Sequence, residues 1–272
     1  MQKEQANKEN KEVPFLGVIN LAPLTNELKS LKRSFELPQD SFGSPTVEED
    51  KFIEACCNQN LVVVQAQLDK GVNINIQSLF GLTPLAVVCK FKHIAVANFL
   101  LDFGADPNIA DSLGVTPLMI AARDGNVELA TLLLDKGANV NLTNVDGINA
   151  VMCATVYHQL DFITLLAEHG ADLNAQTKGG YTPLMNASRG DRADIVKLLL
   201  DLNADIHVTN ECDVSYLQWR MLLGKCEVTK LGSRPEFGNT DRPKTAYDMA
   251  DSDEIKELIK AAQHREQKHV LK

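Results

Sequence analysis

The sequence predicts an all-α solenoid, a stack of helix-turn-helix repeats joined by loops. Two markers support the prediction, and both return every 33 residues. The first is a Gly-Ala pair or a close relative of it, at residues 71–72, 104–105, 137–138, 170–171 and 203–204. The second is Thr-Pro-Leu or a variant of it, beginning at Thr83, Thr116, Asn149 and Thr182. Two markers with one period indicate a stack of similar units, and such a stack presents an extended binding surface.

The repeat at residues 111–143 shows how the sequence specifies each element in turn. Gly114 lies in a turn, where glycine adopts a positive φ without steric cost, and Thr116 supplies an N-cap hydroxyl. The proline after Thr116 occupies the first helical position, where a missing N–H costs nothing. The second helix runs from Val127 to Lys136, with its apolar residues on one face. Gly137 then ends this helix in a left-handed conformation.

The repeated pattern resembles a known family. Asp-x-x-Gly-x-Thr-Pro-Leu-x-x-Ala-Ala, followed by Leu-Leu-Leu-x-x-Gly-Ala-x-x-Asn, is similar to the ankyrin repeat. The resemblance covers residues 47–208, and residues 244–262 look like a terminal helix pair of the same type. It implies an ankyrin-type solenoid with about four full repeats between N-terminal and C-terminal capping repeats.

Two departures from the family pattern affect the packing. The family often has histidine after Thr-Pro-Leu, where the ring ties neighbouring repeats together. This sequence has apolar residues there, so apolar packing must replace the polar ties of that histidine; the residues are Ala86, Met119, Met152 and Met185. In the third repeat Asn149 and Ala150 replace Thr-Pro, which keeps a capping side chain but loses the proline. We expect this helix start to be the softest internal point of the array.

Two segments lie outside the repeat pattern. Residues 25–35 suggest a short helix with Leu24, Leu28 and Leu31 on one face, which either covers the first repeat or binds a second partner. A later insert contains Trp219, the only tryptophan, and is either an arm for a partner or a loop that pads the last repeat. The expected organisation is an N-terminal extension at 1–46 with 1–12 disordered, repeats at 47–208, the insert at 209–243, a capping repeat at 244–262 and a tail at 263–272.

Composition narrows the classes of partner. The net charge of −9 disfavours nucleic acid and anionic membranes as partners, because phosphate binding needs a basic footprint.

No apolar run reaches the roughly 18 residues of a membrane span, and residues 1–24 do not read as a secretory signal. The six cysteines have no metal-binding spacing, and Cys89 and Cys153 are expected to be buried thiols. We therefore expect no metal, no cofactor, a reducing compartment and a cytoplasmic location.

The resemblance implies that a protein partner lies across the hairpin tips and the first-helix faces. The expected partner-binding residues are Leu79, Phe80, Leu82, Lys90, Phe91, Leu113, Val115, Arg123, Asp124, Asp146, Ile148, Tyr157, Lys178, Tyr181, Arg189 and, in the insert, Trp219. Aromatic residues are few in this chain, and Phe80 in particular is expected to be exposed.

These observations favour a monomeric, non-enzymatic interaction module that binds a partner protein and has no small-molecule substrate. Two biological settings stay open. An ankyrin-like array with its own extension and insert resembles effectors that intracellular bacteria deliver into host cells, which would place it in the host cytosol. A resident cytosolic scaffold or inhibitor is the alternative. An enzyme subunit with a site in the insert at 209–243 is a third class, disfavoured because so short a segment cannot shelter a site alone.

Overall fold

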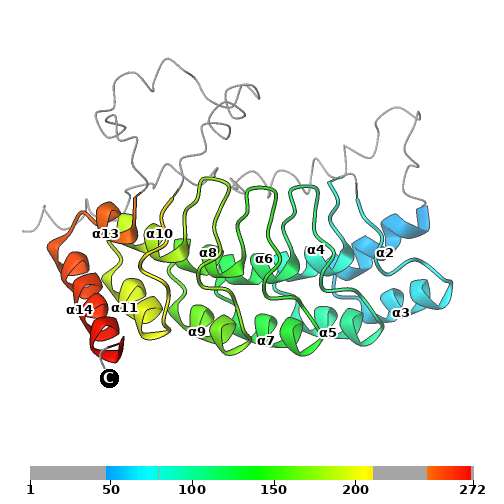
Figure 1. Ribbon diagram of the computed structural model, residues 1–272. Helices are drawn as coiled ribbons and strands as arrows, with labels where there is room; N and C mark the ends of the chain where they lie inside the picture. Colours follow the sequence, from blue (N-terminus) through cyan, green and yellow to red (C-terminus); the bar gives the residue numbers. More distant parts are fainter. Residues whose placement is uncertain (1–46, 79, 211–243, 271–272) are drawn as a thin grey trace, which may run out of the picture. The chain divides into compact units, whose positions relative to one another are not determined.

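The computed structural model describes residues 47–78, 80–210 and 244–270, and all of them belong to one compact unit that begins at Val47. Its helices follow one another as pairs (Figure 1). They are α2 (Val47–Cys57), α3 (Leu61–Asp69), α4 (Pro84–Lys90), α5 (Ile94–Asp102), α6 (Pro117–Asp124), α7 (Val127–Asp135), α8 (Ala150–Val156), α9 (Leu160–Glu168), α10 (Pro183–Arg189), α11 (Ala193–Asp201), α13 (Ala246–Met249) and α14 (Asp253–Val270).

The helices form two layers, as the sequence predicted for a solenoid. Helices α2, α4, α6, α8, α10 and α13 make one row, in which each helix contacts the next. Helices α3, α5, α7, α9, α11 and α14 make the second row, and each of them packs on the first-row helix of its own repeat (Figure 1). Each repeat therefore buries its apolar faces against its neighbours, which is why no single pair could fold alone.

Local sequence explains where the first-row helices begin. Thr83, Thr116 and Thr182 each accept a hydrogen bond from the backbone N–H three residues later, and a proline follows each threonine. Asn149 replaces the threonine before α8, and its Oδ1 accepts from the N–H of Met152 at 3.0 Å. Its Nδ2 also donates to the carbonyl of Asp172 at 3.3 Å. The third repeat thus keeps its cap despite the missing proline.

The position after Thr-Pro-Leu is apolar and buried in every full repeat, which confirms the predicted packing there. Ala86, Met119, Met152 and Met185 are all almost fully buried. The second-row helices contribute the other half of the core, including the fully buried Leu133, Phe162 and Leu166. Small and flexible side chains in the first row allow the helices of successive repeats to approach closely.

Polar ties between repeats come from a different residue than the one that the family often uses. Four asparagines, each 33 residues from the next, accept a backbone N–H from the following repeat through Oδ1, and we call them the asparagine ladder. The bonds run from Asp106 N to Asn75 at 2.9 Å, Asn139 N to Asn108 at 2.7 Å, Asp172 N to Asn141 at 2.8 Å and Asp205 N to Asn174 at 2.8 Å. The ladder binds each loop to the next along the whole array.

The connecting loops fold back as hairpins but contain no β-strand in the described residues. Each loop closes with a pair of backbone bonds such as Asp111 N to Val115 O and Gly114 N to Asp111 O. In the described residues, β-type pairing is limited to one isolated antiparallel bridge, between Asn210 and Lys244. Gly114 has the predicted positive φ of 77°, and the second-row helices end beside residues of positive φ, including Gly137 and Asn203.

The C-terminal helix is longer than the sequence predicted. Ile255, Ile259 and Ala262 of α14 are buried against the array, as expected for a capping repeat. The helix nevertheless continues to Val270, through residues that the sequence assigned to a tail. Two polar contacts accompany this continuation: Glu266 Oε2 lies 3.2 Å from His207 Nε2, and Arg265 forms an ion pair with Asp201 at 3.6 Å.

Candidate functional site

The hairpin tips are joined to each other by backbone hydrogen bonds. Ser112 N donates to the carbonyl of Phe80 at 3.0 Å, and Val145 N donates to the carbonyl of Leu113 at 3.0 Å. A third bond of the same kind joins Lys178 N to the carbonyl of Asp146 at 2.9 Å. These bonds use only main-chain atoms, so they fix the spacing of the tips without using their side chains.

The tips present a row of exposed apolar side chains, which we call the tip row. It consists of Phe80, Leu113 and Val145, whose exposed fractions are 57%, 51% and 43%. The predicted exposure of Phe80 is confirmed. Lys178 continues the row as an exposed polar residue in the next loop. Leu79 lies outside the described residues.

The site prediction is wrong at two positions. Val115 and Ile148 were expected to contact a partner, but both are buried, with exposed fractions of 7% and 6%. The Oδ1 atoms of Asp111 and Asn144 accept the N–H of Val115 and Ile148 at 2.8 Å each. These bonds fold the returning leg of the loop back, so that the two side chains pack inward. The equivalent residues of the other repeats, Leu82 and Tyr181, are half-buried.

The remaining predicted residues differ in their exposure and in their contacts. Tyr157 is exposed, although partial burial raises the pKa of its hydroxyl. Phe91 is half-buried and stacks on His93, with 5.7 Å between the ring centroids. Arg123 and Asp124 form an ion pair with each other at 2.7 Å. Lys90, Asp146 and Arg189 are half-buried, and Trp219 lies outside the described residues.

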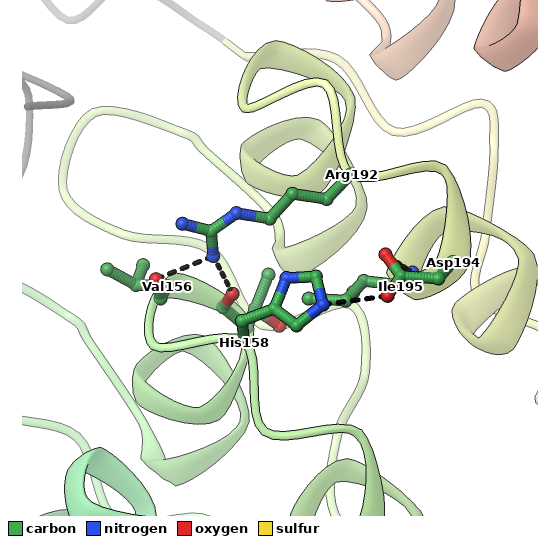
Figure 2. Close-up of polar contacts among 6 residues, drawn as sticks. Val156, His158, Arg192, Asp194 and Ile195 are labelled. Carbon is green, nitrogen blue, oxygen red and sulfur yellow. Dashed lines mark hydrogen bonds and ion pairs between the residues drawn. The ribbon is translucent and has the colours of Figure 1, made fainter. Parts of the chain in front are cut away.

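One polar contact between repeats was not predicted. Helices α4, α6 and α10 each have a basic residue in the last turn, where a cation stabilises the helix dipole, but α8 ends at Val156. Arg192 of the next repeat supplies that cation, because its Nη1 donates to the carbonyls of Thr155 and Val156 (Figure 2). His158 lies beside it, with Nε2 at 2.7 Å from Asp194 Oδ2. The sequence did contain a signal for this contact: Val156 is the one apolar residue at a position that is Lys90, Arg123 and Arg189 in the other full repeats.

Replacing Arg192 with alanine is expected to destabilise the junction of the third and fourth repeats. The change removes charge-assisted bonds to two carbonyls, which we expect to cost about 1–2 kcal/mol of the free energy of unfolding. Urea unfolding followed by circular dichroism measures the loss. Arg192→Lys is the control, since it keeps the charge and should recover part of the stability. Equal stability of wild type and Arg192→Ala would contradict this role.

The described part of the chain contains no group of three or more histidine, cysteine, aspartate or glutamate residues that could hold a metal ion. Cys89 and Cys153 are free and buried, which confirms the prediction for both thiols. Burial raises the pKa of each thiol to about 12. The nucleophilic thiolate is therefore scarce at neutral pH, and neither cysteine is suited to catalysis in the folded protein.

Cys89 and Cys153 are expected to resist alkylation by iodoacetamide at pH 8 in the native protein. Both should react once the chain is unfolded in urea, because unfolding restores solvent access and an ordinary pKa. Peptide mapping by mass spectrometry distinguishes the two cysteines from the other four. Rapid labelling of either residue in the native state would show that its helix opens readily.

Stacked helix pairs joined by similar loops define a helical-repeat protein. The family model for ankyrin repeats matches residues 52–144 and 138–210. The chain therefore belongs to the ankyrin-repeat family, whose members generally mediate protein–protein interaction. A comparison with curated proteins finds no match. Among the described residues, no helix has the length and apolar character needed to cross a bilayer.

Proposed function

We propose that this chain is a non-enzymatic module that binds a segment of a partner protein across its hairpin tips. The tip row of Phe80, Leu113 and Val145 is the observation that supports the proposal. Exposed apolar patches on folded proteins usually mark contact sites, and the backbone bonds between the tips hold this patch in a fixed arrangement. Tyr157, at the end of α8, adds an exposed aromatic ring of the type that dominates binding energy at interfaces.

The polar residues near the tip row indicate the chemistry of the partner. Ser112 and Lys178 are exposed at the tips, while Arg123 already pairs with Asp124. A partner segment with apolar side chains facing the tip row and polar side chains beside them fits this surface. The net charge of −9 argues against nucleic acid as the partner.

Replacing Phe80 and Leu113 together with alanine is expected to weaken partner binding at least about 30-fold, because each truncation removes an exposed apolar anchor worth roughly 1 kcal/mol or more. The partner is first captured from cell lysate with the intact chain, and its affinity for each variant is then measured by calorimetry. The matched control is Phe103→Ala with Val127→Ala, which removes two exposed apolar residues of the second helix row.

Unchanged affinity of the tip variant would overturn the tip row as the binding site. Trp219→Ala would then test the insert at residues 209–243, of which residues 211–243 lie outside the described part of the chain. Equal losses in the tip variant and the second-row control would instead indicate a general effect of truncation. Circular dichroism of each variant shows whether the variant is still folded, so that a loss of affinity is not mistaken for unfolding.

The biological setting of the module is a separate proposal. We propose a monomer that acts in the cytosol, without a cofactor or a small-molecule substrate, either as a secreted bacterial effector that binds a host protein or as a resident scaffold or inhibitor. Capture from eukaryotic lysate and from bacterial lysate distinguishes the two settings, since an effector requires a host target. Loss of a measured activity on deleting residues 210–243 alone would favour an enzyme subunit with its site in the insert.

A further inference from the structure

The solvent-facing side of the second helix row changes from apolar to acidic along the array. One position, in the first turn of α3, α5, α7, α9 and α11, is exposed in all five helices. It is Val62 in α3 and Ala95 in α5, whereas the three later helices have acidic residues there: Glu128, Asp161 and Asp194. Val62 is 80% exposed, more than any other large apolar residue in the described part of the chain. The first two helices therefore present an apolar surface where the other three present charge.

Two phenylalanines extend this surface along α5. Ala95, Phe99 and Phe103 are four residues apart, so they share one side of the helix and its C-cap. The rings of Phe99 and Phe103 stack with 4.5 Å between their centroids, and Phe103 is 48% exposed. The position of Phe103 is polar in α3, α7 and α9, where the residues are Lys70, Lys136 and His169. An exposed aromatic ring therefore stands at a position that most of the second row keeps polar.

The apolar residues of α3 and α5 form one surface, which we call the second-row patch. It consists of Val62, Ala66, Ala95, Phe99 and Phe103, and α3 and α5 are neighbours in the second row (Figure 1). The stripe on α5 is about 12 Å long, and packed helices lie about 8–10 Å apart. In Figure 1 the hairpin loops rise above the first row and the second row lies below it, so the patch is separate from the tip row.

The charges around the second-row patch are mostly acidic. Four exposed acidic residues belong to α3, α5 and α7: Asp69, Asp102, Glu128 and Asp135. The nearby lysines are already engaged, since Lys136 pairs with Asp102 at 2.5 Å and Lys70 pairs with Glu48 at 3.3 Å. The other three acidic residues form no ion pair in the part of the chain that the structure describes. Negative charge therefore remains uncompensated beside the apolar surface.

We propose that the second-row patch binds an amphipathic helix of a partner protein, with apolar residues on one side and lysine or arginine beside them. The backbone groups of α3 and α5 are bonded within their own helices, so an extended segment would find no edge to pair with, whereas a helix satisfies its own backbone. Apolar residues at i, i+4 and i+7 of such a helix match the length of the α5 stripe.

Charge distinguishes this occupant from a second copy of the chain. Basic residues of the partner helix would approach Asp69, Glu128 and Asp135, which is complementary. Two copies of the patch would instead bring these acidic residues against each other, which disfavours a dimer. A partner bound here leaves the hairpin tips accessible, so the chain could hold two proteins at once.

Two synthetic helical peptides of about 14 residues, or roughly four turns, test the proposal. Both have leucine at i, i+4, i+7 and i+11, and the other positions are lysine and alanine in one peptide and glutamate and alanine in the other. Calorimetry with the full chain is expected to show binding of the lysine peptide and at least about tenfold weaker binding of the glutamate peptide. Phe99→Ser with Phe103→Ser should weaken the lysine peptide at least about tenfold, because two aromatic anchors are lost.

The matched control is Leu198→Ser with Leu202→Ser, the same two positions in α11, which should keep the wild-type affinity. Phe103→Lys is a second variant, and it should also lose affinity. Lys136 occupies the equivalent position in the folded array, so this loss cannot be attributed to unfolding. Every variant retains the tip row, which makes the result independent of the function proposed for it. Every variant also retains residues 25–35, where the sequence predicted a helix and which lie outside the described residues.

Four results would overturn the proposal. One is no binding of the lysine peptide to the wild type, and another is wild-type affinity of the Phe99→Ser, Phe103→Ser variant. Equal binding of the two peptides would refute the basic character of the partner. A dimer in light scattering that Phe99→Ser with Phe103→Ser dissociates would identify a second copy of the chain as the occupant instead.

Discussion

Gly114→Ala is expected to lower the free energy of unfolding by about 2–4 kcal/mol, through backbone strain and a steric clash together. Gly114 has a φ of 77°, a conformation that alanine adopts only at a cost. A Cβ at this position would also lie 2.8 Å from the Cα of Asn144 in the next loop. Because that atom belongs to the backbone, the two loops would have to separate, which would weaken the bond between Val145 N and Leu113 O. Urea unfolding monitored by circular dichroism measures the loss.

Gly137→Ala separates the two contributions. Gly137 has a φ of 86°, but a Cβ there would meet no atom within 4 Å. Its substitution should therefore cost only the backbone strain, about 1–2 kcal/mol. If both variants were equally destabilised, close approach of the loops would not explain the glycine at position 114. The tip row should also bind its partner less well in Gly114→Ala than in Gly137→Ala.

Asn149→Ala is expected to destabilise the array by about 2–3 kcal/mol, because it removes a cap and a bond between repeats at one buried position. The side chain is fully buried, so the N–H of Met152 would lose its acceptor without gaining water. The carbonyl of Asp172 would lose the donor that lies 3.3 Å away. Exchange of the amides at the start of α8 should rise more than exchange elsewhere, and urea unfolding gives the total loss.

Asn149→Thr is the informative control for this position. Threonine caps α4, α6 and α10 in the same geometry, so it should retain the bond to Met152 N and lose only the contact with Asp172. We expect it to recover more than half of the stability lost in Asn149→Ala. Equal stability of the alanine and threonine variants would show that capping is unimportant here. Faster exchange at the start of α8 than at α6 in the wild type would support the predicted softness of this helix start.

The repeat architecture was predictable because its signals are local and periodic. Each threonine cap needs only the residues that follow it, and Gly137 and Asn203 end their helices through their own backbone preferences. The position after Thr-Pro-Leu was also predicted as apolar packing, since Met152 and its equivalents have no polar group to satisfy. These features depend on neighbours within a few residues.

The error concerns a contact within one loop, and the omissions concern contacts between repeats. Val115 was assigned to the surface because its place in the loop suggested a tip, whereas the carboxylate of Asp111 folds that leg inward. The asparagine at the end of each repeat was visible in the pattern, but its partner lies 31 residues away and has no signature of its own. Arg192 likewise acts on Val156, a residue noticeable only because it interrupts a basic row. Single-repeat reasoning cannot identify such pairs.

In the proposed binding surface, the backbone bonds between hairpin tips position the loops, whereas the tip side chains would contact the partner. Phe80, Leu113 and Asp146 each contribute a carbonyl to the next tip, and any residue type has the same carbonyl. Their side chains can therefore change without removing a bond that positions the loops. Substitutions at the tips can therefore change which partner the proposed surface binds, while the backbone arrangement of the loops stays constant. This holds as long as glycines such as Gly114 are retained.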